Sequence, residues 1–160
     1  KKLKGNHKLK LIGASESEYK YYCNLRKKLG LCKNVEIYKF IPRPVALTHA
    51  SKCDVLIMAQ PNTEFYKKNI SPLKLFEYMA LGKLIINSKL PSIEEVLKKN
   101  LFSLSFNPGN VYELAELMVE AANNYNSYNR MRRDARIEVM KNYTWEKRAL
   151  KILKNIGACS

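Results

Sequence analysis

Apolar runs and stretches of helical periodicity alternate along most of the chain. Alternating or continuous apolar residues predict five strands, which we expect at residues 8–13, 34–41, 54–59, 83–87 and 101–106. The run at 54–59 is nearly continuous, which is typical of a central strand covered on both faces. Strands that alternate with helices predict right-handed crossovers and a parallel sheet.

Residues typical of helix ends mark the segments between these strands. Ser15 and Glu18 have the spacing of a capping box, and Gly30 ends the helix that they begin. Ser71 followed by proline is typical of another helix start, and Gly82 of its end. We expect the remaining helices at 45–52, at 92–98 and as a group within 111–156, with a polar loop at 61–70.

The pattern predicts a single α/β domain over residues 1–160. Its architecture is a Rossmann-like parallel β-sheet with helices on both faces. The chain has 160 residues, of which 46% are apolar and 10% aromatic, so it can form a packed core. Ligands of such sheets bind beyond the carboxyl ends of the strands, where helix N-termini point outward.

The charge of the chain favours an anionic partner. Lysine and arginine together number 29 against 14 aspartates and glutamates, which gives a net charge of +15. Phosphates, nucleic acid and an anionic membrane surface all fit this excess, and so does a general abundance of lysine in the protein's source. The basic residues form no arginine-rich stripe with interleaved aromatic residues, so we expect no nucleic-acid partner.

Three further observations concern the compartment. No apolar run approaches the roughly 20 residues of a membrane-spanning helix, and no basic and apolar leader opens the chain. Cys23, Cys32, Cys53 and Cys159 lack the spacing of a metal site, and three of them lie in apolar patterns typical of reduced core cysteines. We therefore expect a cytoplasmic protein. The chain begins at Lys1 rather than Met, which predicts that it is part of a longer polypeptide.

The segment from Ser71 to Lys83 carries the most informative chemistry. It follows the most apolar strand, so the helix that begins at Pro72 should start at the ligand edge of the sheet. The free backbone N–H groups of Leu73 and Lys74, together with the Lys74 charge, would bind an anion.

Glu77 lies one turn beyond Leu73 on the same predicted helix. A carboxylate accepts two hydrogen bonds at once, which suits the paired hydroxyls of a ribose. The alternative is that Ser71 and Pro72 only cap a helix and that Glu77 is a surface acid.

The same segment resembles the signature of the retaining glycosyltransferases of family 4. The likeness runs from Ser71 to Ser88 and extends along the chain. Further landmarks in the order of that family lie at residues 9–13, 34–40, 53–57, 93–96, 106–110 and 143–145. The family has the two-domain GT-B fold, so the resemblance implies that this chain is the C-terminal, donor-binding half of that fold.

The resemblance implies roles for the residues of the signature. Glu77 matches the family's second motif glutamate, which holds the ribose hydroxyls of the donor and acts as a catalytic residue. Ser71, Pro72, Leu73 and Lys74 match the turn that touches the donor diphosphate.

It also implies roles for residues nearer the start of the chain. Gly13 matches a glycine that lets the donor approach the end of a strand. Phe40, Ile41 and Pro42 match the loop whose main chain borders the base. We expect Trp145, in a later landmark, to pack under the C-terminal helix rather than to contact a ligand.

Two residues depart from the family pattern, and a third could replace one of them. Asn69 stands where the family has its first, catalytic glutamate, and its amide can hydrogen-bond a sugar hydroxyl without carrying a charge. Glu64, in the same loop, is an alternative carboxylate. Leu84 stands where the family usually has proline, which we expect to change only a turn.

The resemblance also implies a substrate, and it implies that parts of the two-domain enzyme are not included in this chain. The first βα unit of the donor half, with its diphosphate-neutralising basic residues, is missing from the chain, and so is the acceptor-binding half. Chemistry in this fold takes place between the two halves, so the chain alone should not transfer sugar.

A complete enzyme would move a sugar from a nucleotide diphosphate sugar to a polysaccharide or lipid-linked acceptor, without a metal or other cofactor. The basic surface fits peripheral contact with an anionic cytoplasmic leaflet.

Two other functions stay open at this point. A non-catalytic nucleotide-binding or protein-interaction module could keep the same fold, and both Asn69 and the missing first unit favour it. Nucleic-acid binding through the net charge would show a steep dependence on salt.

Overall fold

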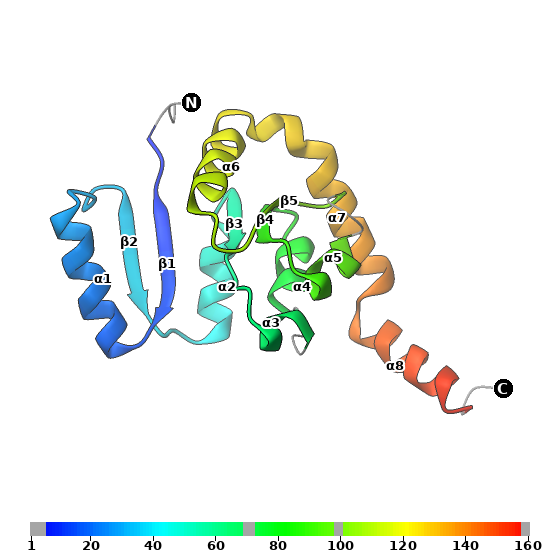
Figure 1. Ribbon diagram of the computed structural model, residues 1–160. Helices are drawn as coiled ribbons and strands as arrows, with labels where there is room; N and C mark the ends of the chain where they lie inside the picture. The colour runs from blue at the N-terminus through cyan, green and yellow to red at the C-terminus, as the bar shows by residue number, and fades with distance from the viewer. Residues whose placement is uncertain (1–5, 69–72, 98–100, 158–160) are drawn as a thin grey trace. The chain divides into compact units, whose positions relative to one another are not determined.

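The computed structural model describes residues 6–68, 73–97 and 101–157 (Figure 1). The chain divides into two compact units, one ending at Lys52 and the other beginning at Cys53. Each unit is an α/β arrangement with its own sheet, and each is described by itself below.

The N-terminal unit is a two-stranded parallel sheet with two helices. Its elements are β1 (Leu9–Ala14), α1 (Glu16–Lys28), β2 (Val35–Lys39) and α2 (Arg43–Ser51). β1 pairs with β2 in parallel, with Leu9 opposite Val35. Parallel pairing requires a crossover between the strands, and α1 provides it.

The ends of α1 are those that the sequence predicts. The Ser15 N–H donates to Oε2 of Glu18 at 2.8 Å, while the Ser15 side chain accepts from the Glu18 N–H. This is the predicted capping box, and it satisfies two backbone donors at once. After the helix, Gly30 has a φ of +68°, a conformation that glycine adopts without strain.

The C-terminal unit alternates strands and helices and ends in a helical tail. Its elements are β3 (Val55–Met58), α3 (Glu64–Lys68), α4 (Leu73–Ala80), β4 (Leu84–Ser88), α5 (Pro91–Leu97), β5 (Leu104–Phe106), α6 (Val111–Asn123), the 3-10 helix η1 (Tyr125–Tyr128), α7 (Asn129–Asn142) and α8 (Trp145–Asn155).

The sheet of this unit is parallel, in the order β3-β4-β5. Val55 lies opposite Leu84, and Ile86 lies opposite Leu104. All five residues of β4 are buried, whereas β3 alternates between buried and half-buried positions. β4 has a partner strand on each side. The cover on both faces that was predicted for the 54–59 run is confirmed, because Met58 of β3 is buried in the core with α4 and α5, while Val55 and Ile57 pack against the core with α6.

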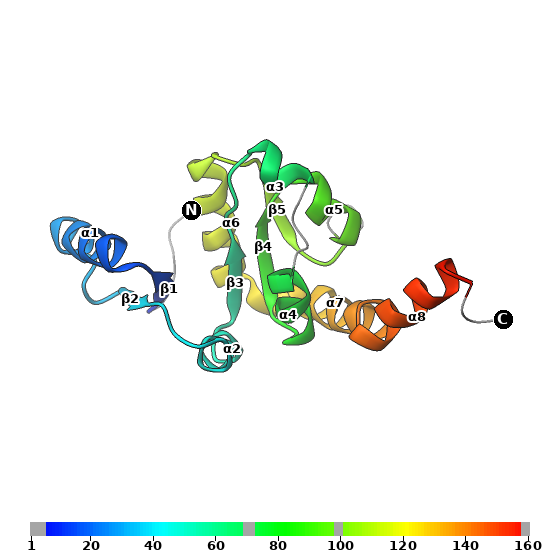
Figure 2. The ribbon, with the colours of Figure 1, turned by 90° about the horizontal axis from the view of Figure 1, so that it is seen from below.

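Helices cover both faces of the β3-β4-β5 sheet, as predicted (Figure 2). On one face Ile85 packs against α4, α5 and α7, through residues such as Leu75 and Ile93. On the other face Leu84 and Ile86 pack against α6. The alternation of side chains along β4 sends successive residues into the two cores.

Several expectations are wrong in detail. The predicted polar loop at 61–70 contains α3, whose first turn is held by Thr63: the Lys67 N–H donates to the Thr63 carbonyl at 3.0 Å. Trp145 is 74% exposed and does not pack under the C-terminal helix. Cys23, Cys32 and Cys53 form no disulfide within the described residues, and none of them is buried. Cys23 stays accessible because α1 buries none of its residues against the small two-stranded sheet.

No helix in the described parts of the chain has the length and apolar character needed to cross a bilayer.

Candidate functional site

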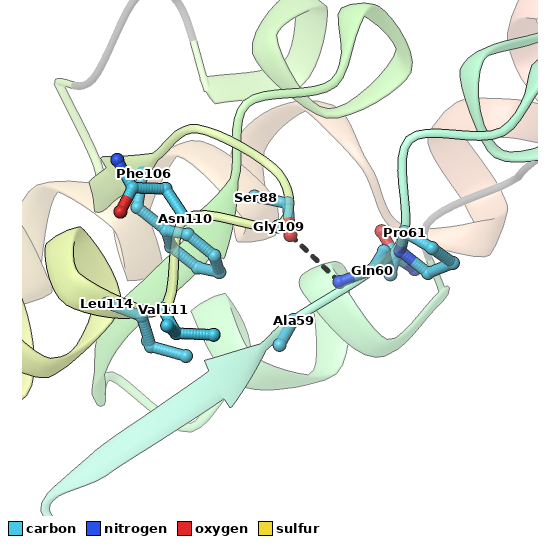
Figure 3. A pocket seen from close by; sticks show the side chains of 9 residues that line it. All are labelled: Ala59, Gln60, Pro61, Ser88, Phe106, Gly109, Asn110, Val111 and Leu114. Atoms are coloured by element: carbon cyan, nitrogen blue, oxygen red, sulfur yellow. Dashed lines mark hydrogen bonds between the residues drawn. The ribbon is translucent and has the colours of Figure 1, made fainter.

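The carboxyl ends of β3 and β4 are tied together by one buried hydroxyl. Ser88, the last residue of β4, is fully buried, and its hydroxyl donates to the Met58 carbonyl at 3.3 Å. The same oxygen accepts from the Gln60 N–H at 2.8 Å, the dashed line in Figure 3. Because both strands end at this hydroxyl, the segment that leaves β3 starts from a fixed position.

Two hydrogen bonds of Asn87 order the end of β4, and one of them links it to β5. The side-chain amide of Asn87, also fully buried, donates to the Ser88 carbonyl at 3.0 Å. Its Oδ1 accepts from the Ser105 hydroxyl at 3.2 Å. The three strand ends are thus joined by side chains as well as by the ladder, which favours a rigid ligand edge.

A cavity of about 230 Å³ opens at this edge, on the α6 side of the sheet (Figure 3). Its walls are largely apolar and come from the ends of the strands and the start of α6: Ala59, Pro61, Phe106, Val111 and Leu114. Gln60 also lines it, and the Gln60 Oε1 atom is buried with no hydrogen-bond partner within the described structure. An unpaired buried carbonyl oxygen is costly, so a ligand hydroxyl or amide that donated to it would recover that cost.

The rim of this cavity is shaped by the start of α6. Gly109 has a φ of +83°, and the turn that contains it brings the Asn110 N–H to the Asn107 carbonyl at 2.9 Å. The Asn110 side chain accepts from the Glu113 N–H at 3.1 Å and so caps α6. The Glu113 carboxylate then accepts from the Asn107 N–H at 2.7 Å. These hydrogen bonds join residues of the rim to one another and so fix the shape of its backbone.

Helix α4 carries the predicted glutamate on the side away from the core. Leu75 and Met79 are fully buried, whereas Leu73 and Lys74 are exposed and Glu77 is half-buried. At 100° per residue, Glu77 follows Leu73 on one face of the helix, opposite Leu75 and Met79. The carboxylate is therefore displayed at the surface of the unit on a helix whose other side is anchored.

Contacts from α7 hold α4 in place. Nη1 of Arg136 donates to the Ala80 carbonyl at 2.9 Å, where the C-terminal carbonyls of α4 lack helical partners. The ring of Phe76 stacks on Tyr143 at a centroid distance of 4.8 Å. Burial raises the pKa of the neighbouring Tyr78 hydroxyl, and the Glu77 carboxylate raises it further. Tyr78 therefore stays neutral beside Glu77 at physiological pH.

The other predicted site residues lie at the carboxyl edge of β1 and β2. Gly13 has a φ of +106° beside a register shift in the ladder, and a Cβ built there would meet no atom within 4 Å. The Phe40 N–H donates to the Ala14 carbonyl at 3.1 Å, so Phe40 and Gly13 come together at one edge. The Phe40 side chain is 80% exposed, Ile41 is half-buried, and Pro42 occupies the N-cap position of α2.

A family model described as "Glycosyl transferases group 1" matches residues 1–138. The chain belongs to the group 1 glycosyltransferases. A search of curated protein sequences gives no significant match.

Solved structures of glycosyltransferases share the fold of this group 1 chain. Anabaena HepE in complex with UDP superposes with a TM-score of 0.76 at 18% identity, over 95% of this chain and 41% of HepE. Sucrose-phosphate synthase from Thermosynechococcus elongatus gives 0.76 at 18% identity, over 96% and 39%. A glycosyltransferase from Rickettsia africae gives 0.72 at 18%, over 96% and 41%. The fold is that of the C-terminal, Rossmann-like half of GT-B glycosyltransferases, and the chain spans about two fifths of these proteins.

Within the glycosyltransferase chain, the predicted site residues fall into three sets. Leu73, Lys74 and Glu77 lie together on α4. Gly13 and the residues from Phe40 to Pro42 share the edge of β1 and β2. Asn69, Ser71 and Pro72 lie outside the described residues. The binding roles of all three sets stay predictions.

Gln60 is not among the site residues predicted from the sequence. The signal was present, because Gln60 is a polar residue directly after the apolar run at 54–59, where ligands of parallel sheets bind. Ser88 was noted only as the end of the signature, and its bridging role depends on strand pairing between positions thirty residues apart. Glu64 lies on α3, exposed, with Oε1 3.0 Å from Nζ of Lys67.

Proposed function

We propose that this chain is the donor-binding domain of a retaining glycosyltransferase of family 4. The complete enzyme would transfer a sugar from a nucleotide diphosphate sugar to a polysaccharide or lipid-linked acceptor. Membership of the group 1 glycosyltransferases supports a sugar nucleotide as the substrate. Since HepE has been solved in complexes with UDP and with UDP-glucose, a uridine donor is our first choice.

The observation that carries this proposal is the placement of Glu77. The carboxylate lies on the outward side of α4, half-buried, in the segment that resembles the family signature. Its two oxygens can accept hydrogen bonds from the 2′ and 3′ hydroxyls of a ribose together. The buried residues Leu75 and Met79 on the opposite side keep the helix from rotating.

Charge on the same helix would assist departure of the diphosphate. Negative charge grows on the nucleotide diphosphate as the bond to the sugar breaks, and fixed positive groups nearby stabilise it. Lys74 is exposed, three residues before Glu77, and can reach a phosphate while Glu77 holds the ribose. Asn69, Ser71 and Pro72 would complete the contacts to sugar and diphosphate. The donor is a substrate, and the proposal includes no metal or cofactor.

The proposal includes parts that this chain does not supply. An acceptor-binding half would close over the donor, because the GT-B reaction takes place between two halves, and without it we expect no transfer. We propose that the enzyme works in the cytoplasm, in peripheral contact with an anionic leaflet that attracts a chain of net charge +15.

Calorimetric titration with UDP-, GDP- and ADP-glucose tests the donor site. We expect one of the three to bind, and Glu77→Gln to weaken that binding at least about tenfold, because it removes a hydrogen bond to a charged group. Glu95→Gln is the matched control, since Glu95 is an exposed glutamate on α5, and it should leave the affinity unchanged. No response to any of the three nucleotides would favour a non-catalytic module instead.

A further inference from the structure

Helix α7 packs along α4, the helix that carries Glu77 (Figures 1 and 2). Leu75 and Met79 of α4 share a buried core with Ala135 and Val139 of α7. α4 has only eight residues, and a helix this short is not stable by itself in water. Its position therefore depends on the elements that it contacts, and α7 is one of them.

The turn that ends α4 includes the backbone of Glu77. The Leu81 N–H donates to the Glu77 carbonyl at 3.0 Å and closes the turn. Within this turn, the Ala80 carbonyl accepts from Nη1 of Arg136, on α7, at 2.9 Å. A contact at Ala80 therefore acts on the same turn of helix that carries the predicted ribose ligand.

The side chain of Arg136 also lies against the residue that follows this turn. Gly82 has a φ of +64°, and a Cβ built there would lie 3.6 Å from Cδ of Arg136, an ordinary van der Waals distance. The stem of the arginine thus passes Gly82 on its way to the Ala80 carbonyl. A cation suits this place, because the carbonyl dipoles make the C-terminal end of a helix negative.

Two directional contacts flank Glu77 along α4. Before it, the ring of Phe76 stacks on Tyr143 with an angle of 21° between the rings. After it, the Ala80 carbonyl binds Arg136. Apolar packing is not directional and tolerates small rotations of a helix, whereas a hydrogen bond weakens steeply as its angle changes. The rotation of α4 is therefore set more finely by these two contacts than by the shared core.

We propose that Arg136 is a positioning residue of the donor site. By binding the Ala80 carbonyl, it sets the rotation of α4 at which the Glu77 carboxylate meets both hydroxyls of the ribose. Two hydrogen bonds to one carboxylate need both angles to be right together, so a small rotation of the helix lowers the affinity. The inference rests on the donor site proposed above and adds to it a residue outside the signature, which acts through Glu77 rather than on the donor.

This role differs from a contribution to stability. Arg136 is exposed, and a hydrogen bond at an exposed position adds little to the free energy of unfolding. The shared core of α4 and α7 remains when the guanidinium is removed. We therefore expect Arg136→Gln to fold normally and to lose only the part of the binding that depends on the ribose hydroxyls.

Calorimetry measures that part directly. The probes are the diphosphate whose sugar nucleotide binds in the titration above (UDP, GDP or ADP) and its 2′,3′-dideoxy form. In the natural chain the ribose form should bind at least about tenfold more tightly than the dideoxy form. In Arg136→Gln we expect this preference to fall to about threefold or less, with the affinity for the dideoxy form unchanged, because only the contacts of Glu77 are disturbed.

Two further variants serve as controls. Arg136→Lys keeps a cationic donor and should restore part of the preference. Arg130→Gln removes the same charge from the same helix, where the side chain is 87% exposed and its Nε lies 3.4 Å from Oδ2 of Asp134, and it should keep the full preference. Urea denaturation should give similar midpoints for all three variants, which excludes a loss of folded chain as the cause.

A double-mutant cycle tests whether Arg136 acts through Glu77. In a chain that already carries Glu77→Gln, the addition of Arg136→Gln should change the affinity for the ribose form by less than about twofold. If the effects of the two substitutions multiply instead, Arg136 acts independently of Glu77 and the proposal is wrong.

The outcomes separate the positioning role from the donor site itself. A full preference for the ribose form in Arg136→Gln would overturn the role of Arg136 and leave the donor site in place. An equal loss of affinity for both probes would show a general structural effect and would also overturn it. Equal binding of the two probes by the natural chain, or no binding of any nucleotide, would overturn the contact of Glu77 with the ribose and the positioning role together.

Discussion

At the scale of single residues, the site depends on polar side chains at strand ends. Ser88 joins the ends of β3 and β4, and Asn87 joins the ends of β4 and β5. The sequence places both residues after an apolar run but does not show which strand each one contacts. The outward position of Glu77 could be predicted, because helical spacing alone places it on the side of α4 opposite Leu75 and Met79.

Ser88→Ala should destabilise the C-terminal unit. The substitution removes the donor to the Met58 carbonyl and the acceptor of the Gln60 N–H, both at a fully buried position. Leaving a buried polar group unpaired costs about 1–3 kcal/mol of unfolding free energy. Urea denaturation measures this loss, and Ser127→Ala, at an exposed position in η1, is the control. Equal stability of the two variants would contradict the bridging role of Ser88.

At the scale of elements, local patterns in the sequence were sufficient to predict most helices and all five strands. The capping box predicted the start of α1, where the Ser15 side chain accepts from the Glu18 N–H. α3 was missed because it is short and polar, although Thr63 offered a helix-start signal. The complete burial of β4 could not be predicted, because it depends on which strands become its neighbours in the sheet.

The capping box of α1 should give that helix a dependence on acid pH. Hydrogen bonds from the Ser15 side chain and backbone lower the pKa of Glu18 below its ordinary value of 4.5. A lowered pKa in the folded state stabilises the helix above pH 4.5, and this stabilisation is lost as pH falls through the folded-state pKa. The protection factors of the amides in the first turn of α1, which take account of the slower intrinsic exchange in acid, should therefore fall below pH 4.5.

Glu18→Gln should remove most of this dependence while leaving the exchange rates near neutral pH close to those of other exposed helix starts. Amide exchange in the first turn of α6 offers an internal comparison, because Asn110, which does not titrate, caps it. A first turn of α1 that stays protected in acid would contradict the role of Glu18.

At the scale of the whole molecule, the fold class could be predicted from the sequence, whereas the net charge did not identify a partner. The fold is the C-terminal half of GT-B glycosyltransferases, and the family match assigns the chain to the group 1 enzymes. The alternation of strands and helices was enough to predict this class, since parallel sheets need helical crossovers. The net charge of +15 is compatible with phosphates, nucleic acid, an anionic membrane surface or a general abundance of lysine in the protein's source. The exposure of Trp145 could not be predicted from the sequence and required the structure.

The donor-site proposal depends on Glu77 holding the ribose of the donor. The most direct test combines a change in the protein with a change in the ligand. Calorimetry would compare UDP with 2′,3′-dideoxyuridine diphosphate, each titrated into the natural chain and into Glu77→Gln. Residues and groups that interact directly give non-additive effects in such a cycle.

We predict that loss of the ribose hydroxyls weakens binding at least about tenfold in the natural chain and by less than about twofold in Glu77→Gln, because the interaction is already absent there. If the two changes instead weaken binding by independent factors that multiply, Glu77 does not contact the ribose, and the donor-site assignment is wrong.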